Sequence, residues 1–208
     1  MAKSAKEIVA DFRRMYSQTY VDTSARLPIP LNSEDDTRYR LMALYQLEVE
    51  HRHREFIDDE STRDKITRVA RWLYCSQQRG LILMGGLGNG KSTMLRIIDR
   101  LFRHTCAFGD AQEVFDYYKK SHGGMRFWDE PLLLIDDLGV EPERCLDYGE
   151  VNYPITRLLL HRYNRQLTTI IATNLWIEDI QARYGDRVMD RMNECYSVIL
   201  YGNESYRK

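Results

Sequence analysis

A glycine-rich segment that ends in a lysine and a serine carries the most specific chemistry in the sequence. It reads Gly85-Gly86-Leu87-Gly88-Asn89-Gly90-Lys91-Ser92-Thr93 and fits Gly-x-x-x-x-Gly-Lys-Ser/Thr at every required position. Small residues let successive backbone N–H groups approach phosphate oxygens, and the dipole of a following helix adds attraction. We therefore predict that residues 85–93 bind ATP, that Lys91 spans the β- and γ-phosphates, and that Ser92 ligates Mg²⁺.

Two carboxylates follow an apolar run farther along the chain. Asp136 and Asp137 come directly after Leu132-Leu133-Leu134-Ile135. Ligands of parallel α/β sheets bind at the carboxyl ends of the strands, and a phosphate-binding loop needs a carboxylate for its metal. We expect Asp136 to hold Mg²⁺ through water and Asp137 to polarise the attacking water. The alternative is that both carboxylates cap the next turn.

A polar amide ends another apolar run, Thr169-Ile170-Ile171-Ala172-Thr173-Asn174. The donor and acceptor groups of Asn174 permit hydrogen bonds to both the γ-phosphate and the lytic water. A lone asparagine is otherwise typical of a turn. The sequence contains no Asn-Lys-x-Asp motif, so guanine selection of the GTPase type has no support.

Two arginines near the C-terminus are spaced for one helical face. Arg187 and Arg191 lie four residues apart. Such arginines can stabilise the γ-phosphate of a neighbouring subunit in the transition state. They can equally pair with Asp186, Asp190 or Glu194, as surface arginines usually do. The residues alone leave both roles open.

Short apolar runs alternate with helical patterns from Arg79 onward. The expected strands cover residues 81–84, 104–108, 132–135, 168–172 and 197–201. The expected helices include 91–102, 111–120 and one that Pro154 opens. This alternation predicts an α/β fold with a parallel five-stranded sheet between helices.

Three amphipathic helices are expected before the first strand. They cover about 4–18, about 37–56, and a segment that starts near 59–62. In the second, Met42, Tyr45, Val49 and Phe56 share one face. We expect an N-terminal helical region, residues 1–60, that binds a protein partner, and a core over residues 61–208.

Composition excludes several classes of protein. The 208 residues include 30 basic and 31 acidic side chains, and the longest apolar runs fall far short of the roughly 20 residues that span a bilayer. The start of the chain has no secretory pattern. The four cysteines are 31, 39 and 50 residues apart, too far for the close pairs of zinc or redox sites. A cytoplasmic protein without a membrane partner is expected.

Taken together, residues 85–93, 132–139, 169–175 and 185–192 resemble the AAA+ ATPases of the DnaC/IstB-like group, the bacterial helicase loaders and transposition helper ATPases. The resemblance covers about residues 65–208 and is specific in 136–139, 173–175 and 187–192. It implies that Arg191, rather than Arg187, is the arginine finger. It also implies a sheet order of 5-1-4-3-2 and an open ring or spiral of subunits with ATP bound between them.

Three departures from the group refine these expectations. Many AAA+ members have Asp-Glu where this chain has Asp136-Asp137, so slow turnover is expected. Only seven residues follow Tyr201, so no C-terminal helical lid is expected. The stretch from Phe102 to Leu132 leaves little room for a large DNA-binding insertion, which leaves single-stranded DNA open as a partner.

The resemblance therefore implies an ATP-hydrolysing accessory factor for DNA replication, a helicase-loader-like oligomeric switch that binds a replicative helicase. A transposition helper ATPase of the IstB type, with a transposase as partner, is the alternative within the group. A small-molecule P-loop kinase is disfavoured because a lid-sized segment is absent. A nucleotide-gated binding module that hydrolyses little or nothing is the non-enzymatic alternative.

Overall fold

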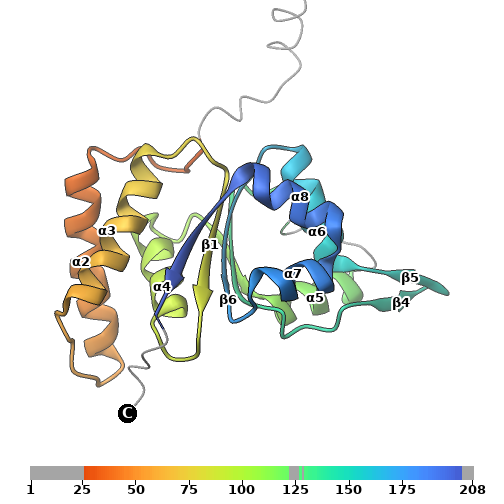
Figure 1. Cartoon of the computed structure of the whole chain (residues 1–208), viewed down its shortest axis with the longest axis horizontal. Coiled ribbons are helices and arrows are strands. Elements are labelled where there is room, and N and C mark those ends of the chain that lie inside the picture. The colour runs from red at the N-terminus through yellow and green to blue at the C-terminus, as the bar shows by residue number, and fades with distance from the viewer. Residues whose placement is uncertain (1–25, 122–126, 128, 203–208) are drawn as a thin grey trace, which may run out of the picture.

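A computed structural model gives the structure of the protein and describes residues 26–121, 127 and 129–202 (Figure 1). The helices are α2 (Glu34–His51), α3 (Glu60–Cys75), α4 (Lys91–Leu101), α5 (Ala111–Lys120), α6 (Pro154–Asn164), α7 (Ile177–Tyr184) and α8 (Asp186–Cys195). The strands are β1 (Gly80–Gly85), β2 (Ala107–Asp110), β3 (Leu132–Leu138), β4 (Cys145–Asp147), β5 (Glu150–Asn152), β6 (Thr168–Thr173) and β7 (Tyr196–Tyr201). No described helix is both long and apolar enough to cross a membrane.

Five of the strands form one parallel sheet in the order β2-β3-β6-β1-β7. Numbered along the chain without the separate β4–β5 pair, this order is 5-1-4-3-2 from the β7 edge, as the resemblance implies. The α/β class and the parallel sheet between helices are confirmed. All five strands run the same way, so their carboxyl ends meet at one edge, where ligands of such sheets bind.

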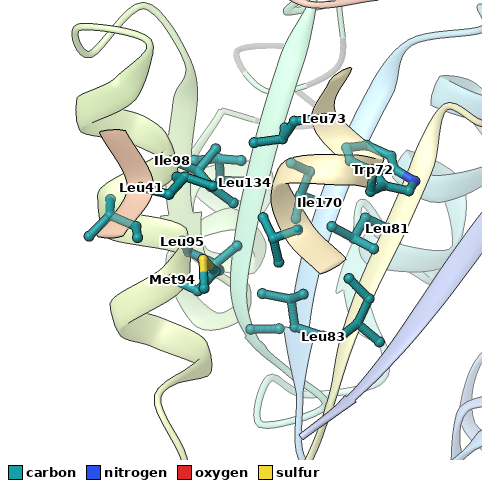
Figure 2. Close-up of a cluster of buried hydrophobic side chains, with 14 of the residues drawn as sticks. Leu41, Trp72, Leu73, Leu81, Leu83, Met94, Leu95, Ile98, Leu134 and Ile170 are labelled. Carbon is teal, nitrogen blue, oxygen red and sulfur yellow. The ribbon is translucent and has the colours of Figure 1, made fainter. Parts of the chain in front are cut away.

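Alternating side chains of the strands build two cores, one on each face of the sheet. Leu81 and Leu83 of β1 pack with α2, α3 and α4, whereas Ile82 and Met84 pack with α5, α6, α7 and α8. Figure 1 shows the two groups of helices on opposite sides of the sheet, and Figure 2 shows the first core. Strands covered on both faces are apolar throughout, which explains the runs 81–84 and 132–135.

The second strand and the β4–β5 pair differ from expectation. The strand begins at Ala107 instead of 104, because Arg103 and His104 have positive φ and the His104 amide donates to the Asp99 carbonyl at 2.9 Å in the turn after α4. The β4–β5 hairpin was not expected from the sequence. Its turn, Tyr148-Gly149, has positive φ at both residues, the geometry of a two-residue hairpin turn.

The described part of the N-terminal region packs on the core. Leu41 and Tyr45 of α2 are buried in the same cluster as residues of α3 and α4. The helix ends at His51 instead of Phe56, because His53 takes a left-handed φ of 55°. Phe56 therefore leaves the helix, although it still packs against this cluster. The helix expected at 4–18 lies outside the described residues, and the division at residue 60 stays a prediction.

Candidate nucleotide-binding site

Segments that are distant in the sequence meet at the carboxyl edge of the sheet. The loop after β1, the end of β3 and the residue after β6 lie around a cavity of about 600 Å³. Residues 87–93, Asp137 and Asn174 line it from the sheet side. Tyr45, Val49 and the turn after α2 line the other side. The cavity is thus bounded by the predicted phosphate-binding loop and by the N-terminal region.

The loop conformation depends on its glycines. Gly90 has φ of 94°, and a Cβ there would lie 2.3 Å from the Tyr45 hydroxyl oxygen of α2. Gly85 has φ of 150°, and a Cβ there would lie 2.2 Å from the Tyr201 carbonyl oxygen of β7. The helix α4 begins at Lys91 without a side-chain cap. Its first N–H groups are therefore available to an anion.

Lys91 is 5% exposed and connects the loop to β6. Its Nζ donates to the carbonyl oxygens of Gly85 at 2.8 Å and Gly86 at 2.7 Å, and to Asn174 Oδ1 at 2.8 Å. Asn89 Oδ1 lies 3.2 Å from the same nitrogen. Two predicted site residues that lie 83 positions apart in the chain are therefore in direct contact. A phosphate entering the loop would offer this ammonium better acceptors than the carbonyl oxygens.

Ser92 and Asp136 form a second contact across the site. The Ser92 hydroxyl donates to Asp136 Oδ1 at 3.0 Å, and the Asp137 amide donates to the same oxygen at 3.0 Å. Burial, and then the neighbouring Asp137, raises the pKa of the Asp136 carboxyl above its usual range, while these two hydrogen bonds oppose the rise. Hydroxyl and carboxylate oxygens are hard ligands, and Mg²⁺ binds through one or two of them while keeping several waters. The pair fits the predicted metal site.

Asp137 lines the cavity through an uncommon backbone conformation. Its φ is 49°, and the pairing of β3 with β6 shifts register between Ile135 and Leu138. A non-glycine residue at positive φ costs conformational energy and is often found at functional sites. The bulge ends the alternation of β3, so Asp137 leaves the sheet core and lines the cavity, where a nucleophilic water could bind.

A buried carboxylate that no sequence motif marks fixes the turn after Asp137. Glu141 Oε2 accepts from the Gly139 amide at 2.9 Å, and Glu141 Oε1 accepts from the Tyr184 hydroxyl at 2.6 Å. Arg183 donates to the Glu141 carbonyl oxygen. These contacts tie the end of β3 to α7. No spacing rule points to Glu141, because its partners come from a distant helix.

Arg191 lies outside the cavity of its own chain. Its Nη1 is 3.4 Å from Glu194 Oε2 and 3.5 Å from Asp190 Oδ2, and its guanidinium stacks 4.9 Å from the Tyr163 ring centre. The local pairing that the sequence left open is therefore present. Exposed pairs of this kind contribute at most about 1 kcal/mol, so they do not bind the side chain tightly. Its role toward a neighbouring subunit stays a prediction.

Replacing Asp136 by asparagine tests the cost of its buried charge. Because its pKa is raised above 3.8, the neutral carboxyl is the form that the fold favours. That stabilisation is complete below the ordinary pKa and is lost as the pH rises through the raised pKa of the folded state. We expect Asp136→Asn, without metal, to melt at a higher temperature than the wild type at neutral pH, since the amide oxygen still accepts from Ser92.

Circular dichroism melting curves measure this difference, which should shrink as the pH approaches 3.8. Asp190→Asn, at an exposed carboxylate of α8, is the control and should melt close to the wild type. A lower melting temperature for Asp136→Asn at neutral pH would contradict the proposed electrostatic cost.

Comparisons with known proteins identify the fold. No protein-family model matches the chain, and no curated protein matches it. The crystal structure of the DnaC helicase loader superposes with a TM-score of 0.54 and 22% identity over 71% of this chain and 93% of that one. DnaI superposes with a TM-score of 0.55 and 22% identity over 82% and 93%. AMPPCP-bound DnaA from Aquifex aeolicus superposes with a TM-score of 0.51 and 19% identity over 72% and 48%. The chain thus shares the fold of these structures, and the fold that the sequence resemblance implies is confirmed.

Proposed function

We propose that the protein binds Mg-ATP in this cavity and hydrolyses it slowly. The observation that supports this most strongly is the meeting of three distant segments, with Lys91 Nζ 2.8 Å from Asn174 Oδ1 and Ser92 Oγ 3.0 Å from Asp136 Oδ1. A glycine-rich turn without a ligand has no need of a buried lysine at this point. The fold is shared with an AMPPCP-bound DnaA, which supports a nucleotide as the ligand.

Each side chain then has a defined role. Lys91 exchanges its carbonyl partners for the β- and γ-phosphate oxygens, and residues 85–93 offer backbone N–H groups to the phosphates. Ser92 and Asp136 would hold Mg²⁺, which would neutralise charge on the phosphates when bound. Asp137 orients the attacking water, and Asn174 binds the γ-phosphate and that water. Because aspartate is one methylene shorter than glutamate, Asp137 reaches the water less well, which accounts for slow hydrolysis.

The proposed site is completed by a second copy of the chain. Arg191 lies on α8, outside its own cavity, and its exposed ion pairs with Asp190 and Glu194 are weak enough to exchange. In an ATP-bound oligomer it would stabilise the γ-phosphate of the neighbouring subunit. ATP binding and assembly are then coupled, and the oligomer acts as a switch.

The biological role that we propose is that of a helicase-loader-like accessory factor for DNA replication. The support is the shared fold with DnaC, DnaI and DnaA and an apolar stripe on the outer face of α2. This stripe contains Tyr39, which is 65% exposed, Ala43, and Leu47, which is 56% exposed. Exposed apolar side chains gathered on one helix face are typical of contact surfaces. The replicative helicase is the proposed partner, and a transposase remains the alternative.

The nucleotide assignment is tested with two variants. Lys91→Ala should weaken ATP binding at least about tenfold, because the cationic partner of the phosphates is lost. Asp137→Asn should keep ATP affinity and slow phosphate release about a hundredfold, because the residue acts on water. Titration with a fluorescent ATP analogue and a phosphate-release assay measure the two effects. Unchanged affinity in the first variant, or an unchanged rate in the second, would refute the corresponding role.

The shared site is tested through the dependence of turnover on protein concentration. The wild type should show ATPase activity per subunit that rises with concentration, and Arg191→Ala should remove this rise while leaving ATP affinity unchanged. Arg187→Ala, at an exposed position one turn earlier on the same helix, is the matched control. Wild-type turnover per subunit that is independent of protein concentration would argue against an arginine supplied by a neighbouring subunit. An equal loss of activity in Arg191→Ala and Arg187→Ala would argue against it as well.

The partner surface is tested by making the α2 stripe polar. Tyr39→Ser together with Leu47→Ser, introduced into the Asp137→Asn protein held with ATP, should abolish its co-purification with a replicative helicase without changing ATP affinity. The control is Leu146→Ser with Val151→Ser, which changes exposed apolar residues of the β4–β5 hairpin at the far side of the molecule (Figure 1). If the α2 variant co-purified with as much helicase as the protein with an unchanged α2, the proposed surface would be contradicted.

A further inference from the structure

The turn after α2 brings two arginines to the cavity. Arg52 is the first residue after the helix, Arg54 comes two residues later, and both line the space opposite the loop. With Lys91 they make three cationic side chains in the lining, against the two carboxylates of Glu55 and Asp137. Neither arginine belongs to a recognised nucleotide-binding motif. Their presence shows that the side of the cavity formed by the N-terminal region also suits an anion.

Arg52 is held in a defined orientation by a buried carboxylate. Its Nε and Nη2 donate to Glu48 Oε1 at 3.0 and 2.6 Å. Glu48 is 3% exposed, and its Oε2 lies 2.7 Å from Arg100 Nη2 of α4. A carboxylate anchored between two helices restricts the guanidinium more than a surface pair would. The remaining nitrogen, Nη1, is the one directed to the phosphate-binding loop, where it lies 3.4 Å from Thr93 Oγ1.

Three successive residues of the loop have three different partners. Lys91 contacts Asn174, Ser92 contacts Asp136, and Thr93 is approached by Arg52. Successive side chains of a helix are turned by about 100°, so the three point to different parts of the site: Lys91 to the end of β6, Ser92 to β3 and Thr93 to the turn after α2. In the proposed site, Lys91 contacts the β- and γ-phosphates of the nucleotide and Ser92 contacts the metal ion. Thr93 faces the α2 side of the cavity, which these two roles leave for the α-phosphate.

The apolar lining beside Arg52 supports the same orientation of the ligand. Val49, Phe56 and Ile57 line the cavity on the α2 side. Such side chains suit a base, whereas phosphates need donors and cations. Arg52 lies in the chain between Val49 and Phe56 and faces the loop. It is thus placed where the nucleoside joins the phosphates.

We propose that Arg52 binds the α-phosphate of the nucleotide and that Glu48 is its positioning residue. The inference rests on the proposed function, since it assigns a contact within the same site. An arginine suits this role because its planar fork donates to a carboxylate and a phosphate at once. The end of α2 is then a direct ligand contact, and the N-terminal region detects any nucleotide, ATP or ADP alike.

Calorimetric titration of the full chain with Mg-ATP and Mg-ADP tests the assignment. Arg52→Ala should weaken both nucleotides by the same factor, about tenfold, because the α-phosphate is common to them. Arg40→Ala is the matched control: it lies on the same helix and forms the same i,i+4 pair, with Asp36, away from the cavity. This control should bind both nucleotides as the wild type does.

A second variant separates a loss of nucleotide binding from a folding defect. Arg52→Gln keeps an amide donor for Glu48 while it removes the charge, and it should show the same loss at a wild-type melting temperature. The inference would be overturned if Arg52→Gln bound both nucleotides with wild-type affinity, or if the loss of affinity were confined to ATP. It would also be overturned if Arg40→Ala lost as much affinity as Arg52→Ala. Because nucleotide binding by the wild type is measured first, its absence would instead overturn the proposed function, and this inference with it.

Discussion

The buried ammonium of Lys91 imposes the constraint on which the rest of the site depends. A charge removed from water is costly unless hydrogen-bond acceptors surround it, and here the acceptors come from Gly85, Gly86 and Asn174. They can meet only if β1 and β6 are neighbours in register. The pairing of Met84 with Thr173 provides this, because it places the residues that follow each strand side by side. The sheet order is therefore also a condition for the site.

Two energetic costs of the fold lie where the proposed chemistry occurs. Asp137 has a left-handed backbone, and Asp136 carries a carboxyl whose pKa is raised by burial and by its neighbour. Both features destabilise the metal-free fold, and the two apolar cores offset them. A divalent cation would favour the ionised Asp136 and so relieve part of the cost. Conformational or electrostatic strain that a ligand relieves is a common property of functional sites.

The sequence predicted what depends on local pattern and missed what depends on distant partners. The loop with its strand and helix, and the two acids at the end of β3, follow from spacing, because phosphate binding by backbone groups allows little variation. The end of α2 was placed too late because the apolar period continues to Phe56, while no glycine marks the left-handed turn at His53. Arg52 and Glu141 could not be found from their neighbours, since their contacts with Thr93 and Tyr184 exist only in the folded chain.

The two faces of α2 give this helix a place in both parts of the proposed function. Its inner face contacts the loop, since the Tyr45 hydroxyl lies against Gly90 and Glu48 holds Arg52. Its outer face presents Tyr39 and Leu47 to solvent. The two faces belong to one hydrogen-bonded helix, so a displacement of the helix at its inner face would also move its outer face. A partner bound to the outer stripe would therefore bias nucleotide affinity, and the nucleotide would bias partner affinity equally.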